Sequence, residues 1–538
     1  MITATHTDSA RRDRYLTSGE WSRSTIDSGL AEYAHHHPDR LAVVDGDRQV
    51  SYAELDAMIR RLAGVLLERG IRPGDSVVWQ LPNWLEAIVV HHGALRIGAV
   101  STPIIPIYRH REVQFILKQS RARIAFVPGM FRTFDHRGMF DELAPTLPDL
   151  EHVITVRGSD NEFDQILSGA TPLDNPVSHA STDIALLLYT SGTTSDPKGA
   201  LHTHESLDYE NRSIIELFDL TGEDIVYMPS PVGHITGILY GLQLPFMLGS
   251  HVVFQDIWDP GAGLELLQRR RCTFVVGATP FLHGLVHHPH RAEYDITLRV
   301  FGCGGADVPP ELIRQAEEQL GCTATRIYGS TEFPTLSGGN ASDPLDKRAT
   351  TDGRPIGSAE ARAVDEHDTP VPPGAVGDLQ VRGPDLFTGY VDSTLNADAF
   401  TSDGWFRTGD LAVIDEDGYI QITGRRKDII VRGGENISAK EIEDLLFEYP
   451  GIADIAVIGM PDPIMVERIC AYVVPSDQAH PPALDELTSF LREHRVATQK
   501  LPERLEVVEQ LPRTATGKIQ KFVLRDRIRD ALASDNAV

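Results

Sequence analysis

The sequence predicts an α/β protein: a large N-terminal domain of layered parallel sheets and helices with a small β-rich subdomain, followed by a small C-terminal α+β domain. Two observations predict this fold. Short apolar, β-branched segments alternate with amphipathic ones over most of the chain, and the composition changes at Asp365 and again after Arg425. Alternating strands and helices are typical of parallel sheets covered by helices. With 538 residues, the chain also exceeds the size at which one core stops growing, so at least two domains are expected.

The alternation assigns elements in chain order. The expected strands are 76–81, 99–105, 124–128, 251–255 and 273–280, and the expected helices are 84–98, 111–120, 265–272 and 311–320. The most apolar segment, 237–249, is too short and too rich in glycine to cross about 30 Å of hydrocarbon as a helix. We therefore expect it to be a buried core helix, and we expect no membrane span.

Two changes of composition divide the rest of the chain. From Asp365, short segments rich in Gly, Pro and Asp indicate hairpins, which predicts a β-rich subdomain over 365–425 inside a domain of residues 1–426. The polar run GRRKD (424–428) then predicts a joint before a compact domain, 427–538. Its expected elements are a strand at 428–434, a helix at 438–450, strands at 452–460 and 469–475, a helix at 484–495 and a C-terminal helix.

Charge and cysteine content exclude some classes of function. A formal charge of −27 opposes binding to nucleic acid or to an anionic membrane, because a polyanion is repelled by phosphate-rich surfaces. The sequence contains no CxxC pair, which fits a reducing compartment. We therefore expect the cysteines to be free thiols, mostly buried: Cys272, Cys303, Cys322 and Cys470. The N-terminus has two adjacent arginines but no apolar segment after them, so we expect neither a secretory nor a twin-arginine signal and place the protein in the cytoplasm.

Two histidine clusters raise the question of a metal site. HHHP (35–38) and HHPH (287–290) lack the accompanying acid or cysteine pattern of a metal site, so both are predicted to lie on the surface.

The segment YTSGTTSDPKG (189–199) predicts a phosphate-binding loop. It follows the apolar run IALLLYT and combines hydroxyl groups, glycines and one lysine. Backbone N–H groups and Ser/Thr hydroxyls can surround phosphate oxygens while a lysine supplies positive charge. The segment is not the GxxxxGK[ST] loop, because Lys198 stands late, behind Pro197, and no helix pattern begins directly after it.

Further motifs follow in a fixed order: GCGGA (302–306), YGSTE (328–332), WFRTGD (405–410), GRRKD (424–428) and PRTATGKIQK (512–521). Together with the loop, they resemble the motifs of the adenylate-forming superfamily: acyl-CoA and aryl-CoA synthetases, firefly luciferase and the adenylation domains of peptide synthetases. The resemblance extends from about Ala31 to Leu524. It implies a two-step reaction that consumes ATP and requires Mg²⁺. The first step forms an acyl-adenylate and pyrophosphate, and the second passes the acyl group to the thiol of coenzyme A with release of AMP.

The resemblance also implies roles for particular residues. Glu332 would bind Mg²⁺, Thr331 would contact the α-phosphate, and Asp410 with Arg425 would bind the ribose, while Lys518 would stabilise the transition state between two anions. The nucleotide would be bound by Thr190, Ser191, Gly192, Thr193, Thr194, Lys198, Gly304, Gly305, Ala306, Tyr328, Gly329, Ser330, Thr331, Asp410 and Arg425. Ser195 departs from the usual glycine of the loop, and we expect a small effect.

The same resemblance predicts how the acid and the thiol are handled. Within PVGHITG (231–237), it implies that His234 is a gate between the acid pocket and the pantetheine channel. It also implies that the small domain rotates about Lys427, within GRRKD, and that Gly433 and Gly434, within VRGGENIS (431–438), lie at the channel. The predicted pocket wall is His234, Ile235, Val276, Gly302, Cys303, Phe333 and Leu336. This wall is apolar and contains small residues, which would admit a ring or a bent chain.

Three functions remain open. The first is an acyl- or aryl-CoA ligase; segment 104–117 and the chain length are similar to the bacterial branch that activates medium-chain, cyclic or aromatic acids, such as cyclohexanecarboxylate. The second is an adenylating enzyme that loads a carrier-protein thiol in trans. The third is a non-catalytic nucleotide sensor, which is disfavoured by the intact Lys198, Glu332, Asp410 and Lys518. A homodimer is also left open.

Overall fold

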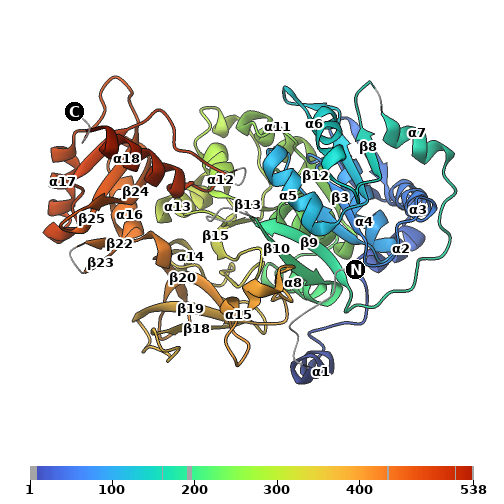
Figure 1. The fold of residues 1–538 in the computed structure, drawn as a ribbon, viewed down its shortest axis with the longest axis horizontal. Coiled ribbons are helices and arrows are strands. Elements are labelled where there is room, and N and C mark those ends of the chain that lie inside the picture. The colour runs from blue at the N-terminus through green and yellow to red at the C-terminus, as the bar shows by residue number, and fades with distance from the viewer. Residues whose placement is uncertain (1–8, 160, 191–196, 433–434, 515–516, 536–538) are drawn as a thin grey trace.

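The computed structural model describes residues 9–159, 161–190, 197–432, 435–514 and 517–535 (Figure 1). The N-terminal part contains two large sheets and a smaller antiparallel sheet. The residues after 428 form a separate sheet with its own helices, at the left of Figure 1.

The first sheet is mixed but has a parallel centre. Its six central strands run parallel, and short antiparallel strands pair at both of its edges. In spatial order it contains β17 (Arg354–Pro355), β16 (Ser337–Gly338), β15 (Thr323–Tyr328), β14 (Val300–Cys303), β13 (Phe274–Gly277), β11 (Ile225–Met228), β12 (His251–Phe254), β1 (Leu41–Asp45) and β2 (Arg48–Ser51).

The second sheet is parallel except at one edge, where β10 pairs antiparallel with β9. Its order is β10 (Lys198–Thr203), β9 (Ile184–Thr190), β4 (Val100–Pro103), β3 (Ser76–Trp79), β5 (Ile124–Pro128) and β8 (His152–Val156). The segment after β5 adds the small hairpin β6 (Met130–Phe131) and β7 (Phe134–Asp135).

Helices cover these two sheets. Helix α3 begins with a capping box, in which the Ser51 hydroxyl accepts from the Glu54 N–H and the Glu54 carboxylate accepts from the Ser51 N–H. The helices of this part are α1 (Ser9–Ser18), α2 (Ile26–His36), α3 (Tyr52–Glu68), α4 (Leu85–Arg96), α5 (His110–Ser120), α6 (His136–Leu143), α7 (Glu162–Gly169), α8 (His204–Leu217), α9 (Ile235–Gly237), α10 (Leu244–Leu248), α11 (Pro260–Arg270), α12 (Thr279–Val286), α13 (Pro310–Leu320) and α14 (Leu345–Thr350).

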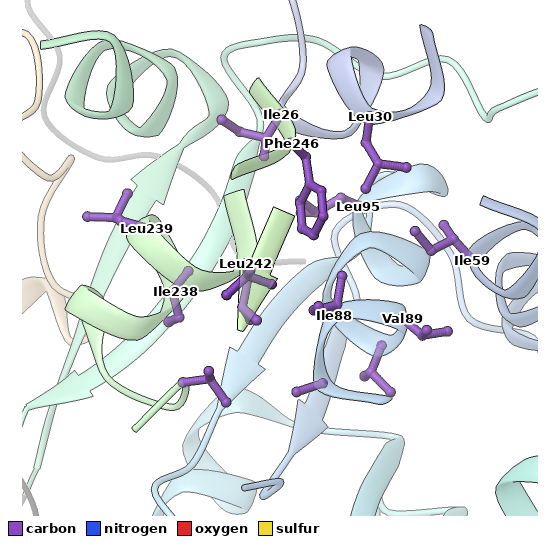
Figure 2. Packing of buried hydrophobic residues seen from close by; sticks show 14 of the residues in the cluster. Ile26, Leu30, Ile59, Ile88, Val89, Leu95, Ile238, Leu239, Leu242 and Phe246 are labelled. Atoms are coloured by element: carbon purple, nitrogen blue, oxygen red, sulfur yellow. The ribbon is translucent and has the colours of Figure 1, made fainter. Parts of the chain in front are cut away.

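The largest core cluster joins the two sheets. It combines side chains of both sheets, such as Trp79 and Val252, with those of α4, which is buried on every side. Figure 2 shows Ile88 of α4 together with Ile238 and Leu242 among the side chains of this cluster. Truncating one of these side chains, as in Ile88→Ala, would remove its transfer free energy and leave a cavity, at a cost of about 2–5 kcal/mol.

The apolar segment predicted as a buried helix is helical and buried. Residues Ile238–Gln243 form a π-helical stretch (η2) that continues into α10. Within the described part of the chain, no helix is both long and apolar enough to cross a membrane.

A third, antiparallel sheet follows, of β18 (Glu360–Val364), β19 (Val376–Arg382), β20 (Phe406–Ile414) and β21 (Ile420–Arg425), with α15 (Asn396–Ala399) between β19 and β20. The β-rich subdomain therefore starts at Glu360 and not at Asp365. The first strand carries no excess of Gly, Pro or Asp, which appear only in the hairpin after it.

A short 3₁₀ turn, η5 (Arg426–Asp428), connects β21 to the last sheet. That sheet contains β22 (Ile429–Arg432), β23 (Glu435–Ser438), β24 (Ile452–Asp462), β25 (Val466–Pro475) and β26 (Arg504–Val507), with helices α16 (Ala439–Phe447), α17 (Leu484–Glu493) and α18 (Lys521–Asp535). Two core clusters of its own bury both faces of the sheet. The predicted fold class is thus confirmed, and the predicted boundary after residue 426 falls inside η5.

The predictions for cysteines and histidine clusters can also be compared with the structure. All four cysteines are buried free thiols, as expected. His35, His36 and His37 are exposed, as are His287 and His290, while His288 is half-buried.

Candidate active site

The motif segments meet at one edge of the first sheet. Residues 304–306 follow β14, and residues 329–332 follow its neighbour β15. The carboxyl ends of parallel strands lie at the same edge of a sheet, which is where ligands bind in open α/β folds. The sheet therefore brings the predicted adenine and phosphate segments side by side.

A tight turn presents Thr331 and Glu332. The Ser330 N–H donates to the Phe333 carbonyl at 2.8 Å, and the Ser330 hydroxyl accepts from the Glu332 N–H at 3.2 Å. Only glycine fits at position 329, because a Cβ there would lie 1.8 Å from the Pro334 carbonyl oxygen. The turn thus fixes the backbone that carries the predicted magnesium ligand.

Glu332 has a partner that the motifs did not identify. The Tyr390 hydroxyl donates to Glu332 Oε1 at 2.7 Å, and Lys198 Nζ lies 5.4 Å from the centre of the Tyr390 ring. Burial, with a further contribution from Glu332, raises the pKa of Tyr390, so its hydroxyl stays a donor. Tyr390 therefore connects the lysine of the phosphate loop to the predicted magnesium ligand.

His202 is the second site residue that sequence reasoning missed. Its Nε2 lies 2.7 Å from the Thr331 carbonyl oxygen, and burial lowers its pKa to about 4. The ring is neutral, and Nε2 carries the hydrogen because a carbonyl oxygen only accepts. His202 thus fastens the turn of β15 to β10. A single histidine in an apolar strand resembles an ordinary core residue, so the sequence around His202 does not indicate a role in the site.

The ribose pair predicted from WFRTGD and GRRKD lies together on neighbouring strands. Asp410 of β20 is the register partner of Arg425 of β21, and Arg425 Nε lies 3.0 Å from Asp410 Oδ1. The Tyr328 hydroxyl donates to Asp410 Oδ2 at 2.5 Å. Tyr328, Asp410 and Arg425 form one hydrogen-bonded group at the end of β15.

Lys518 is brought to this group by the loop before α18. The Thr514 N–H donates to the Lys518 carbonyl at 2.8 Å, and Arg513 bridges to Ile519 across the loop. Gly517 has φ +83°, and a Cβ there would lie 2.7 Å from Pro280 Cγ, so the loop packs closely on the start of α12.

The pKa of Lys518 depends on its burial and on the charged groups near it. Burial is the main cause that lowers its pKa to about 8, and the positive charges of Arg425 and Lys427 lower it further, while Asp410 and Glu332 act in the opposite direction. Lys518 therefore lies within electrostatic reach of both the ribose pair and the predicted magnesium ligand.

His234 precedes α9 and faces the same region. Burial, with a smaller contribution from Lys518, lowers its pKa to about 4, so its ring is neutral. Its Nδ1 accepts from the Thr236 N–H at 3.4 Å, a long hydrogen bond.

The predicted wall of the acid pocket is divided by the structure. Ile235 and Val276 share the large core cluster, and a Cβ at Gly302 would touch Val276. Cys303 instead packs with Phe301 in a second cluster, because successive residues of a strand point to opposite faces of the sheet. Phe333 and Leu336 pack into the core of the β-rich subdomain. The prediction that these three line one wall with Val276 is not supported by this packing.

Several predicted residues lie outside the described part of the chain or at its limits. Ser191, Gly192, Thr193, Thr194 and Ser195 of the loop and Gly433 and Gly434 of the channel are outside it. Thr190 ends β9 opposite Lys198, and Gly304, Gly305 and Ala306 follow β14. Lys427 lies in η5, where burial lowers its pKa to about 8.

This fold and site define an adenylate-forming enzyme. A family model described as "AMP-binding enzyme" matches residues 30–391, and one described as "AMP-binding enzyme C-terminal domain" matches residues 441–518. The chain belongs to this family. The class predicted from the motifs, an AMP-forming acid–thiol ligase, is confirmed.

Similar proteins cover nearly the whole chain. A medium-chain fatty-acid–CoA ligase of Escherichia coli K12 is 39% identical over 533 residues, covering 98% of this chain and 94% of the relative. A salicylyl-CoA synthase / salicylate adenylyltransferase of a Streptomyces species is 35% identical and covers 98% of both chains. Among solved structures, ATP-bound MatB from Rhodopseudomonas palustris matches with a TM-score of 0.86 and 28% identity, covering 95% of this chain and 100% of that one.

Proposed function

We propose that this enzyme joins a medium-chain or aromatic carboxylic acid to coenzyme A through an acyl-adenylate, and that the residues described above carry out the first step. The observation that supports the residue roles most directly is that the charges of the Asp410–Arg425 pair and of Glu332 all act on Lys518. The Lys518 ammonium group can therefore interact with both anions of the adenylation step, the substrate carboxylate and the α-phosphate of ATP.

In the first step, a carboxylate oxygen of the acid attacks the α-phosphorus of ATP and pyrophosphate leaves. Asp410 holds the ribose, Lys198 faces the leaving phosphates, and the Lys518 ammonium stabilises the charge that builds up on the α-phosphate. Glu332 fits Mg²⁺, since it offers a hard oxygen beside Thr331 and is oriented by Tyr390. Bound there, Mg²⁺ would neutralise phosphate charge.

In the second step, the coenzyme A thiol attacks the acyl carbon, the bond to AMP breaks, and the thiol proton leaves. We propose that His234, neutral beside the apolar Ile235, forms part of the passage between the acid and the thiol. Lys427 would be the hinge of the small domain, and Gly433 and Gly434 would leave room for the pantetheine arm.

The nature of the acid rests on the relatives. A medium-chain fatty acid and salicylate are named for two of them. Val276 is buried beside Gly302, and Ile235 is buried in the same core cluster as Val276, which agrees with an apolar substrate. Four buried free thiols fit a reducing compartment, so we place the reaction in the cytoplasm. A homodimer stays a prediction.

Pyrophosphate and AMP release tests the function. Purified enzyme with ATP and Mg²⁺ is screened against benzoate, salicylate, cyclohexanecarboxylate and linear acids of about six to twelve carbons, with and without coenzyme A. We expect AMP formation to rise when coenzyme A is added. If AMP formation does not respond to coenzyme A while pyrophosphate is still released, a carrier-protein thiol is the acceptor.

Lys518→Ala separates the two half-reactions. We expect it to abolish most adenylation and to spare thioester formation from a supplied acyl-adenylate. Lys500→Ala is the matched control, because Lys500 pairs with Glu441 within the small domain at 2.7 Å. Equal loss of both half-reactions in Lys518→Ala would overturn the role of Lys518.

A further inference from the structure

A second lysine of the small domain contacts the large domain, at a distance from the reacting groups. Lys440, in the first turn of α16, forms an ion pair with Asp307, which directly follows the predicted adenine segment. Its Nζ also lies 2.8 Å from Asp444 Oδ1, one turn further along α16. Lys440 thus has one carboxylate partner on each side of the contact between the domains.

In this contact the Lys440 side chain is mostly shielded from solvent, whereas both carboxylates are exposed to it. The Lys440 side chain is 15% exposed, whereas Asp307 and Asp444 are 49% and 48% exposed. Asp307 therefore keeps contact with water if Lys440 moves away, and Lys440 keeps Asp444 because both lie on one helix. Breaking the Lys440–Asp307 pair leaves no buried charge without a partner, which would otherwise be costly.

The Asp307 loop is attached to the surface that also receives the Lys518 loop. The Thr279 hydroxyl donates to the Asp307 carbonyl at 2.6 Å, and the next residue, Pro280, is the one against which Gly517 packs. Two contacts of the small domain, Gly517 on Pro280 and Lys440 on Asp307, therefore meet the start of α12. Two separate contacts restrict the rotation of the small domain, whereas a single contact would not.

We propose that Lys440 is a positioning residue for adenylation: its reversible ion pair with Asp307 holds the small domain in the orientation that places Lys518 at the site. Asp444 receives the lysine when the domain leaves this orientation. The proposal rests on the proposed function in one respect, the use of Lys518 for adenylation. Because the pair is partly exposed, its loss should change the population of this orientation by about two- to fivefold and not abolish it.

The first test measures orientation without any acid or coenzyme A. Dyes are attached to cysteines introduced as Glu318→Cys on α13 and Glu493→Cys on α17, both exposed positions. Burial raises the pKa of each native thiol to about 12, so the native cysteines should not be labelled. Single-molecule energy transfer in ATP and Mg²⁺ should show the adenylation orientation about two- to fivefold less populated in Lys440→Gln.

The second test measures the half-reactions. With the acid turned over fastest in the screen, Lys440→Gln and Asp307→Asn should slow pyrophosphate release by a similar factor and leave thioester formation from the synthetic adenylate unchanged. The charge reversal Asp307→Lys with Lys440→Glu should restore part of the rate. Asp444→Asn, which breaks only the pair inside α16, should keep the adenylation rate.

Three results would overturn the proposal. The first is an unchanged distribution of energy transfer in Lys440→Gln. The second is an equal loss of rate in both half-reactions. The third is a double variant, Asp307→Lys with Lys440→Glu, that releases pyrophosphate more slowly than either of its two single variants. The first measurement needs only ATP and Mg²⁺, so it stays informative if the acid or the acceptor thiol differs from those proposed above.

Discussion

Tyr390 and Glu332, which are far apart in the sequence, form a hydrogen bond of 2.7 Å at the centre of the candidate site. Tyr390 is held by the β-rich subdomain and Glu332 by the turn after β15. The bond therefore orients the predicted magnesium ligand from a second sheet.

Tyr390→Phe should weaken the response to Mg²⁺. Partners that orient a metal ligand typically contribute about 10- to 100-fold in metal affinity or activity, and we expect the lower end of that range. The measurement is the Mg²⁺ concentration that gives half-maximal pyrophosphate release. Tyr449→Phe, in the small domain, is the control, since Tyr449 packs on Phe490. An unchanged Mg²⁺ response in Tyr390→Phe would contradict this role.

The pH dependence of adenylation should report Lys518. Its pKa is lowered to about 8, and the charged form is the one that acts, so activity is present below that pH and is lost as pH rises through it. We expect kcat/KM for ATP to fall above about pH 8. Lys518→Arg keeps its charge at every such pH, so its profile should lose this alkaline decline even if its rate is low. A decline at the same pH in both proteins would assign it to another group.

Asp410→Asn should impair recognition of the ribose. A hydrogen bond to a charged group contributes about 1.5–3 kcal/mol, which corresponds to roughly 10- to 100-fold in kcat/KM for ATP. The sharper measurement compares ATP with its 2′-deoxy and 3′-deoxy analogues, because the variant should discriminate among them less than the native enzyme does. If discrimination is the same in both, Asp410 does not contact the ribose.

A buried carboxyl pair makes stability depend on pH. The carboxyls of Glu210 of α8 and Asp385 after β19 are both buried and lie close together, and the Tyr240 hydroxyl donates to Glu210 Oε1 at 2.5 Å. Burial raises the pKa of both carboxyls, and Glu210 raises that of Asp385 further. The folded protein therefore keeps a proton between them that the unfolded chain releases as pH rises.

The free energy of unfolding should then fall as pH rises above the ordinary pKa range of Asp and Glu, by up to about 1.4 kcal/mol per pH unit for one retained proton. The stabilisation is complete at low pH and is lost as pH rises towards the raised pKa. Asp385→Asn supplies the hydrogen permanently, so its slope should be smaller. Urea denaturation at several pH values compares the two, with the exposed Asp403→Asn as control. Parallel slopes would mean that the pair does not retain the proton.

Much of the site could be predicted because its residues stand in motifs at strand ends. Gly329 identifies the turn that holds Glu332. The antiparallel pairing of β20 with β21 brings Asp410, in the motif that begins β20, beside Arg425, at the end of β21. Tyr390 and His202 could not be found in this way, because each is a single residue whose partner comes from a distant part of the chain.

The acid pocket was the least predictable part. Gly302 and Cys303 are adjacent in the sequence, yet successive positions of a strand point to opposite faces: a Cβ at Gly302 would touch Val276, whereas the Cys303 side chain packs in the cluster of Phe301. Likewise, Phe333 directly follows Glu332 but packs into the β-rich subdomain, close to Gly383. Nearness in the sequence is therefore a poor guide to the cluster into which a side chain packs.

The strand β21 ends at Arg425, which pairs with Asp410, and the turn that leads to the small domain begins at the next residue. The ribose pair and the connection between the domains are therefore consecutive on one stretch of backbone. The length of the connection from Arg425 to Ile429 limits how far the small domain can lie from the Asp410–Arg425 pair. An insertion of one or two residues there would leave every side chain of the nucleotide site in place and still separate it from Lys518, so this short turn should tolerate changes of residue far better than changes of length.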